Sequence, residues 1–241
     1  MSQINEKQQM SEGKNAPRGL KEAFDHVLVL DGAMGTMIQT YGLEEKDFRG
    51  NLFPDIEWQM QGNNDVLTLT RPDVIADIHR RYLQAGADII CTNTFSSQRI
   101  SLADYHCEHL VKEINRVAVR LARSVADEFS TPDWPRFVVA SVGPTNKTCS
   151  MSPDVNDPAF RGITFDELAA AYLEQFVSLL ESGVDAVLME TIFDTLNTKA
   201  GIYAFRQATR QTGVQVPLML SVTVNDKAGR TLSGQTLEAF L

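Results

Sequence analysis

Hydrophobic and polar positions follow two different periods along the chain. Short apolar runs, typical of strands buried on both faces of a parallel sheet, occur at 27–30, 87–91, 137–142, 184–189 and 218–224. Between them, apolar residues recur every three or four positions, as on one face of a helix, from 70 to 86, from 96 to 129 with a break near 104–108, from 164 onwards and from 194 to 213. The pattern predicts strand-helix units in series.

One of these units occurs twice in the same register. Aligning Gly86 with Gly183 places Asp88 on Asp185 and a polar strand tip, Asn93, on Glu190. Such repeats build either an open doubly wound sheet or a (β/α)8 barrel. The long loops after the first and third strands favour the barrel. The predicted fold is therefore an α/β fold, a partial (β/α)8 TIM barrel with about five of its eight βα units. That arrangement would leave two unpaired strand edges and an uncovered interior.

Local signals mark where the helices begin and end. Thr70, followed by Arg71 and Pro72, predicts a helix start with Thr70 as the N-cap. Thr164 and Glu167 form a capping-box pattern, and Asp194 or Thr195 is expected to cap the helix that ends near Gly213. A further helix is expected to begin at Thr236.

Acidic and amide side chains stand where the strands end. In parallel α/β folds these ends face the ligand, so Asp31, Asn93 and Glu190 are candidate substrate groups. For Glu190 the alternative is a loop acid or helix cap. The turn Gly32, Ala33, Met34 would point backbone N–H groups outward, although a simple strand-to-loop turn explains it equally well.

Cysteine and histidine are sparse and scattered. Cys91 is expected one layer below Asn93 on the same strand face, more readily as a small apolar filler than as a ligand. His106 and His109 are three apart, but nothing completes a metal-binding set around them. Three widely spaced cysteines fit reduced thiols better than disulfides or a CxxC zinc site.

Composition narrows the class of protein. The 241 residues carry a formal net charge of -9 and no Lys/Arg-rich run, which argues against nucleic-acid binding and for small-molecule chemistry. The longest apolar runs are too short for a membrane span, and no secretory signal begins the chain, so a cytoplasmic protein is expected. Residues 1–19 are polar and predicted to be a disordered tail, leaving 20–241 as the folded domain.

Several motifs occur together in a fixed order. They comprise 30–36 (LDGAMGT), 62–65 (GNND), 85–90 (AGADII) with 92–95 (TNTF), 143–147 (GPTNK), 152–161 (SPDVNDPAFR), 190–194 (ETIFD) and 229–235 (GRTLSGQ). From about residue 20 to the end, the chain closely resembles the amino-terminal homocysteine-binding barrel of cobalamin-dependent methionine synthase. A betaine-type relative would not share the run 152–161.

The resemblance implies zinc-dependent methyl transfer to the sulfur of homocysteine. The methyl group would come from methylcobalamin, recharged from 5-methyltetrahydrofolate, through the folate and cobalamin domains of the whole enzyme. Asp31 and Glu190 would receive the substrate ammonium, and the turn at Gly32, Ala33 and Met34 would receive its carboxylate.

Two features depart from the family pattern. The zinc ligands of the family are a cysteine after the sixth strand and a Cys-Cys pair at the eighth, both expected beyond the five units counted here, and none of the three cysteines replaces them by position. Cys91 stands where relatives usually carry Glu. We therefore expect little methyltransferase activity from this chain alone. The alternatives are an inactive or split remnant that only binds a ligand or another subunit, and a different barrel lyase using Glu190 as a general base.

Overall fold

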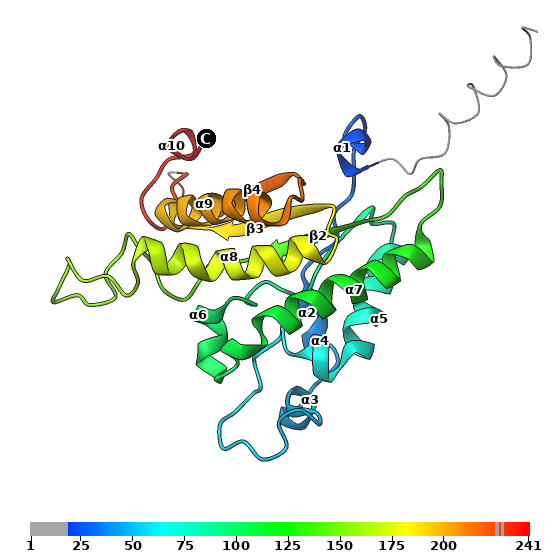
Figure 1. The fold of residues 1–241 in the computed structure, drawn as a ribbon, viewed down its shortest axis with the longest axis horizontal. Coiled ribbons are helices and arrows are strands. Elements are labelled where there is room, and N and C mark those ends of the chain that lie inside the picture. The colour runs from blue at the N-terminus through cyan, green and yellow to red at the C-terminus, as the bar shows by residue number, and fades with distance from the viewer. Residues whose placement is uncertain (1–18, 225–226, 228) are drawn as a thin grey trace, which may run out of the picture.

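The computed structural model describes residues 19–224, 227 and 229–241, and the predicted tail at 1–18 lies outside the described residues. Within the described part, a parallel sheet in the order β1-β2-β3-β4 forms the centre (Figure 1). The strands are β1 (Ile89–Cys91), β2 (Phe137–Val142), β3 (Ala186–Ile192) and β4 (Leu218–Val222). The helices are α1 (Leu20–Ala23), α2 (Met34–Gln39), α3 (Glu45–Arg49), α4 (Leu67–Thr70), α5 (Pro72–Gln84), α6 (Arg99–Leu102), η1 (Ala103–Tyr105), η2 (Glu108–Leu110), α7 (Val111–Phe129), α8 (Phe165–Glu181), α9 (Thr195–Thr212) and α10 (Leu237–Phe240).

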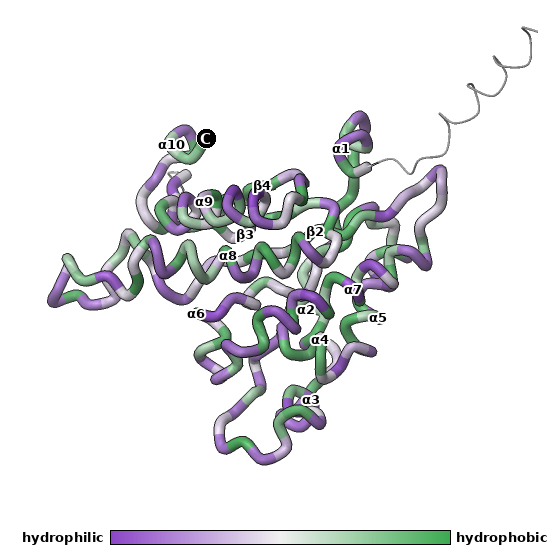
Figure 2. Tube along the Cα trace, in the orientation of Figure 1, coloured by the Kyte–Doolittle hydropathy of each residue, from purple (hydrophilic) through white to green (hydrophobic). Residues whose placement is uncertain are grey.

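The long helices form one layer on the outer face of the sheet. α5 packs on α7, α7 on α8 and α8 on α9, so consecutive crossovers lie side by side, as in a barrel wall. In Figure 2, α8 alternates between hydrophobic and hydrophilic stretches, which is the pattern of a helix with one face on the sheet. The partial (β/α)8 architecture expected from the sequence is confirmed. No described helix combines the length and hydropathy that a membrane span requires.

The inner face of the sheet has much less cover. Its buried residues pack with Leu20 and Ala23 of the short helix α1, which closes only one end. At the two edges of the sheet, Leu30 and Leu220 remain 43% and 40% exposed. The open interior and free edges that five barrel units imply are therefore present among the described residues.

The sequence predicts a buried strand at 27–30, and this prediction is wrong. Only Leu30 pairs with the sheet, through an isolated parallel bridge to Ile89, and Val27 is 88% exposed. The reason is its position at the edge, where no strand lies on the other side and the inner face is open. The predicted cap at Thr70 is also wrong. Thr70 ends α4, and Arg71 precedes α5 because a residue before proline disfavours the helical conformation.

The repeated strand entry is confirmed in detail. Gly86 and Gly183 adopt φ values of +104° and +89°, which glycine tolerates best, and each is followed two residues later by an aspartate that immediately precedes the strand. Asp88 Oδ2 accepts a 2.8 Å hydrogen bond from Val29 N, and Asp185 Oδ2 accepts one of 2.7 Å from Val138 N. Each carboxylate thus fixes its own strand against the preceding one.

The other predicted helix signals are confirmed. Thr164 and Glu167 form a reciprocal capping box on α8, Asp194 caps α9, and Gly213 ends α9 with φ +74°. Thr236 caps α10, and the segment 96–129 is broken into α6, η1, η2 and α7 near the predicted position.

Candidate functional site

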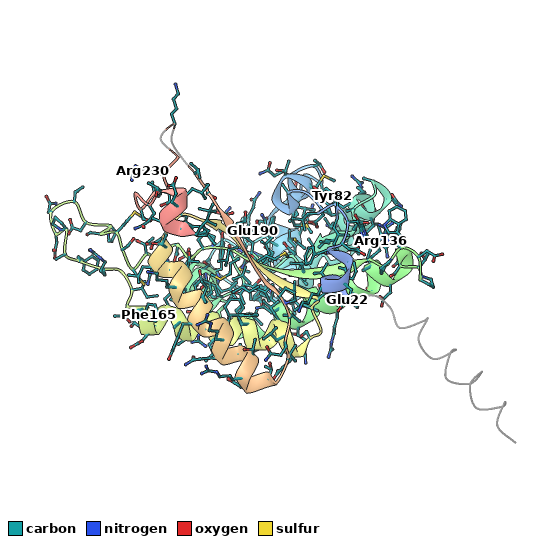
Figure 3. All side chains as sticks on the ribbon, turned by 90° about the horizontal axis from the view of Figure 1, so that it is seen from above. Glu22, Tyr82, Arg136, Phe165, Glu190 and Arg230 are labelled. Atoms are coloured by element: carbon teal, nitrogen blue, oxygen red, sulfur yellow. The ribbon has the colours of Figure 1, made fainter. Side chains whose placement is uncertain are left out.

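A cavity of about 630 Å³ opens at the carboxyl ends of the strands. Asp31 reaches it from the end of the edge segment, Asn93 from the loop after β1, and Glu190 from β3. The turn 32–34 forms another part of its wall. All six residues proposed from the sequence therefore line one cavity: Asp31, Gly32, Ala33, Met34, Asn93 and Glu190. Glu190 lies close to the centre of the molecule in Figure 3.

The turn 32–34 is held by a tyrosine from α5. Tyr82 Oη donates a 3.2 Å hydrogen bond to Ala33 O. A Cβ placed on Gly32 would lie 2.8 Å from this same hydroxyl, so a larger residue here would displace the Tyr82 side chain. Glycine at position 32 is therefore favoured by its close packing against Tyr82, as well as by the turn that the sequence suggests.

Asp31 is anchored to the neighbouring strand. Its N–H donates to Ile89 O at 2.9 Å, and its Oδ2 accepts a 2.8 Å hydrogen bond from Cys91 N. Burial raises the pKa of Asp31 to about 7; the hydrogen bonds from Cys91 oppose the rise, and the negative charge of Glu190 adds to it. A carboxylate with a pKa this far from its ordinary value is typical of a functional site.

Glu190 is positioned by a bulge in β3. The register with β4 shifts between Met189 and Ile192, and Thr191 adopts φ +57°. This left-handed conformation is strained for a β-branched residue, and such strain concentrates at functional sites. Ser141 of β2 donates a 2.6 Å hydrogen bond from Oγ to Glu190 Oε1. Glu190 was predicted at the end of its strand, whereas β3 continues two residues beyond it.

Cys91 lies in the cavity wall between the two carboxylates. Burial is the main cause that raises the pKa of its thiol well above the ordinary value, and the charges of Asp31 and Glu190 add to it. The sequence predicts Cys91 as a small apolar residue that fills space in the interior. In the structure it is only half-buried, and it lines the cavity. β1 ends at Cys91, and Cys91, Thr92 and Asn93 all line the cavity, so the placing of Cys91 and Asn93 on one face of a strand stays a prediction.

Asn93 is fixed by α4 and by the loop that precedes it. Its Nδ2 donates to Asn64 O at 2.8 Å and to Thr68 Oγ1 at 3.2 Å. Asn64 itself belongs to the wall of a second, adjoining cavity.

Two residues of the site were missed by the sequence analysis. Ser141 could have been noticed, because it carries the only hydroxyl group in the apolar run 137–142. Its partner Glu190, however, lies 49 residues away in the sequence. Phe95 lines both cavities, and its ring lies against Gly143, where a Cβ would come within 2.6 Å of it. Only the folded sheet brings these segments together.

The described residues do not fit a zinc site. No group of three or more His, Cys, Asp or Glu side chains among them is arranged to hold a metal ion. Cys91 faces the cavity, whereas Cys107 and Cys149 are buried in two separate hydrophobic clusters. His106 and His109 are exposed, and His106 packs against the Trp58 ring at 4.8 Å.

The comparisons with known proteins bear on the fold and on the family. Among solved structures, the homocysteine methyltransferase MmuM from Escherichia coli is similar in its metallated form, with a TM-score of 0.69, 20% identity, and coverage of 92% of this chain and 72% of that one. The oxidized form of the same protein is similar with a TM-score of 0.68 and 20% identity, and the match covers 93% of this chain and 71% of that one. This likeness shows the fold. The family model for homocysteine S-methyltransferase matches residues 28–241, and the chain therefore belongs to the homocysteine S-methyltransferase family.

Proposed function

We propose that the cavity between Asp31 and Glu190 binds homocysteine as the acceptor in a methyl transfer to its sulfur. The observation that carries the proposal is the convergence of two carboxylates and a glycine turn, from distant parts of the sequence, on one cavity. The substrate ammonium would lie between Asp31 and Glu190. Its carboxylate would accept hydrogen bonds from the backbone of the turn 32–34, and Asn93 would contribute a polar contact.

The charge balance of the cavity supports an ammonium ligand. Asp31 and Glu190 repel each other, which contributes to the raised pKa of Asp31. An ammonium between them removes that repulsion and favours the ionised form of Asp31. Cys91 stays neutral because its thiol pKa is raised, so it does not add a third negative charge.

The sulfur end of the substrate requires chemistry that the described residues do not supply. A thiol is mostly protonated at neutral pH, and the zinc of the family would stabilise the thiolate. The cavity between Asp31 and Glu190 would bind and orient the ammonium and carboxylate groups of homocysteine.

More specifically, we propose that the chain is the homocysteine-binding module of a cobalamin-dependent methionine synthase. Methylcobalamin and 5-methyltetrahydrofolate would be handled by the folate and cobalamin domains of that enzyme. The run 152–161 supports this assignment within the family, together with the order of the other motifs.

Calorimetric titration with homocysteine tests the assignment of the site. Glu190→Gln removes the charge but keeps the acceptor for Ser141, and we expect the affinity to fall about 10- to 100-fold, as for a lost hydrogen bond to a charged group. Glu57→Gln, at an exposed position, is the matched control and should bind like the wild type. An unchanged affinity in both Glu190→Gln and Asp31→Asn would exclude the cavity as the homocysteine site.

A further inference from the structure

A second cavity of about 570 Å³ adjoins the first. Met34, Gly35, Asn93 and Phe95 line both, so the two share a wall. The carboxylates of the proposed homocysteine site do not line the second cavity, which belongs instead to the loop 62–65, the segment 95–105 and the loop 144–146. It is therefore a separate volume next to the substrate site.

A buried carboxylate stands in its wall. Asp65 is 5% exposed, and its Oδ1 accepts hydrogen bonds of 3.0 Å from Ser96 N and 2.7 Å from Ser97 Oγ. Burial raises its pKa to about 6, so the side chain is still mainly ionised at neutral pH. None of the described Lys, Arg or His side chains forms an ion pair with it. A buried charge without a counter-ion is costly, and a cationic ligand would remove that cost.

The rest of the cavity wall also favours a positively charged ligand. It contains no basic side chain, and the exposed Asp104, which accepts a 2.8 Å hydrogen bond from Asn146, adds a second carboxylate at the rim. The aromatic residues Phe95 and Tyr105 also line the cavity, and the face of an aromatic ring attracts cations. The wall therefore favours a positively charged organic ligand over a neutral or anionic one.

One further group points to a ligand with an acceptor. Asn63 is 3% exposed and lines the cavity, and its Oδ1 accepts from Val66 N at 3.3 Å. Its Nδ2 is buried with no hydrogen-bond partner among the described residues. Buried donors in native proteins are almost always satisfied, so a ligand oxygen at this point would complete the wall.

We propose that this second cavity binds an organic ammonium ion that also carries a hydrogen-bond acceptor. The ammonium contacts Asp65, and the acceptor receives the hydrogen bond from Asn63. This ligand is additional to homocysteine, and the shared wall at Phe95 places the two bound molecules next to each other.

The test uses 4-hydroxybenzylamine as the probe, titrated into the whole chain and followed by NMR at pH 7.5. We expect saturable binding that is at least tenfold weaker for the neutral analogue 4-hydroxybenzyl alcohol and for the anion 4-hydroxybenzoate. Asp65→Asn should weaken amine binding at least tenfold, whereas Asp127→Asn, the matched control at an exposed position of α7 outside the cavity, should change it less than threefold. Saturating homocysteine should not displace the amine.

Three results would overturn the proposal. They are equal binding of the amine and the alcohol, unchanged binding in Asp65→Asn, and displacement of the amine by homocysteine, which would place it between Asp31 and Glu190. If Asp65→Asn does not fold, as judged by its thermal transition, the selectivity of the wild type for the amine decides the question. Homocysteine affinity is measured separately, so failure here leaves the proposed function standing.

Discussion

The carboxylate of Asp31 accepts a 2.8 Å hydrogen bond from the backbone N–H of Cys91, although 60 residues separate them. This bond ties the end of an exposed edge segment to β1, the neighbouring strand of the sheet. It also directs the Asp31 carboxylate toward the cavity that Glu190 lines from the other side. The two acids are therefore close enough for the charge of one to raise the pKa of the other.

The raised pKa of Asp31 predicts a pH-dependent affinity for homocysteine. Below about pH 7 Asp31 becomes protonated and loses its attraction for the substrate ammonium, so affinity should fall as the pH is lowered from 8 to 6. In Asp31→Asn the affinity should be lower and this part of the pH dependence absent. Calorimetry at several pH values measures both, and a parallel pH dependence in the two proteins would contradict the prediction.

Ser141→Ala should weaken homocysteine binding about three- to tenfold. The substitution removes the 2.6 Å hydrogen bond that fixes Glu190, while an alanine fits the same strand position. In the Glu190→Gln background, where the charge is already absent, the same change should have a smaller effect. A double-mutant cycle measures this coupling, and strictly additive losses would show that Ser141 does not act through Glu190.

Thr191→Gly should stabilise the protein by about 1 kcal/mol. Glycine removes the strain of φ +57°, worth about 1–3 kcal/mol, and this gain exceeds its extra unfolded-state entropy of about 0.5–1 kcal/mol. Thr191→Ala is the control, because alanine keeps the strained backbone and should change the stability little. Urea unfolding compares the two variants, and equal stabilities would mean that the conformation carries no strain.

His79 should make the protein sensitive to acid. It is fully buried in α5 without a partner for either ring nitrogen among the described residues, and burial lowers its pKa to about 4. The unfolded chain takes up a proton near pH 6.5 and the folded chain does not. Stability that is present above pH 6.5 is therefore lost as the pH falls toward 4, by up to about 3 kcal/mol.

His79→Leu removes this proton uptake, so its stability relative to the wild type should rise as the pH falls from 7 to 4. Unfolding in urea at each pH measures the difference. The raised pKa values of Asp31 and Asp65 act in the opposite direction, but they are present in both proteins and cancel. His109→Gln, at an exposed position, should show no such trend.

Zinc content checks the absence of a metal site in the described part of the chain. Because no group of acidic, cysteine or histidine side chains there is arranged for a metal, the purified chain should contain far less than one zinc per molecule. Its turnover with methylcobalamin and homocysteine should be correspondingly small. Stoichiometric zinc after dialysis, measured by mass spectrometry, would contradict both expectations.

The strand-helix order, most helix ends and the six candidate residues could be predicted from the sequence. These follow from local rules: apolar periodicity identifies each element, a cap satisfies the first N–H groups of a helix, and parallel strands present their carboxyl ends on the same side. The repeat at Asp88 and Asp185 also has a local sequence signal, and its hydrogen bonds are equivalent in the structure.

The way the candidate groups act on one another depends on contacts made in the folded protein. The Ser141 contact with Glu190, the position of Cys91 between two carboxylates and the wall at Phe95 join segments far apart in the sequence. Burial, which sets the pKa of Asp31, Asp65 and His79, depends on the same packing. The exposure of Val27 has this cause too, since an apolar run is buried only where another part of the fold covers it.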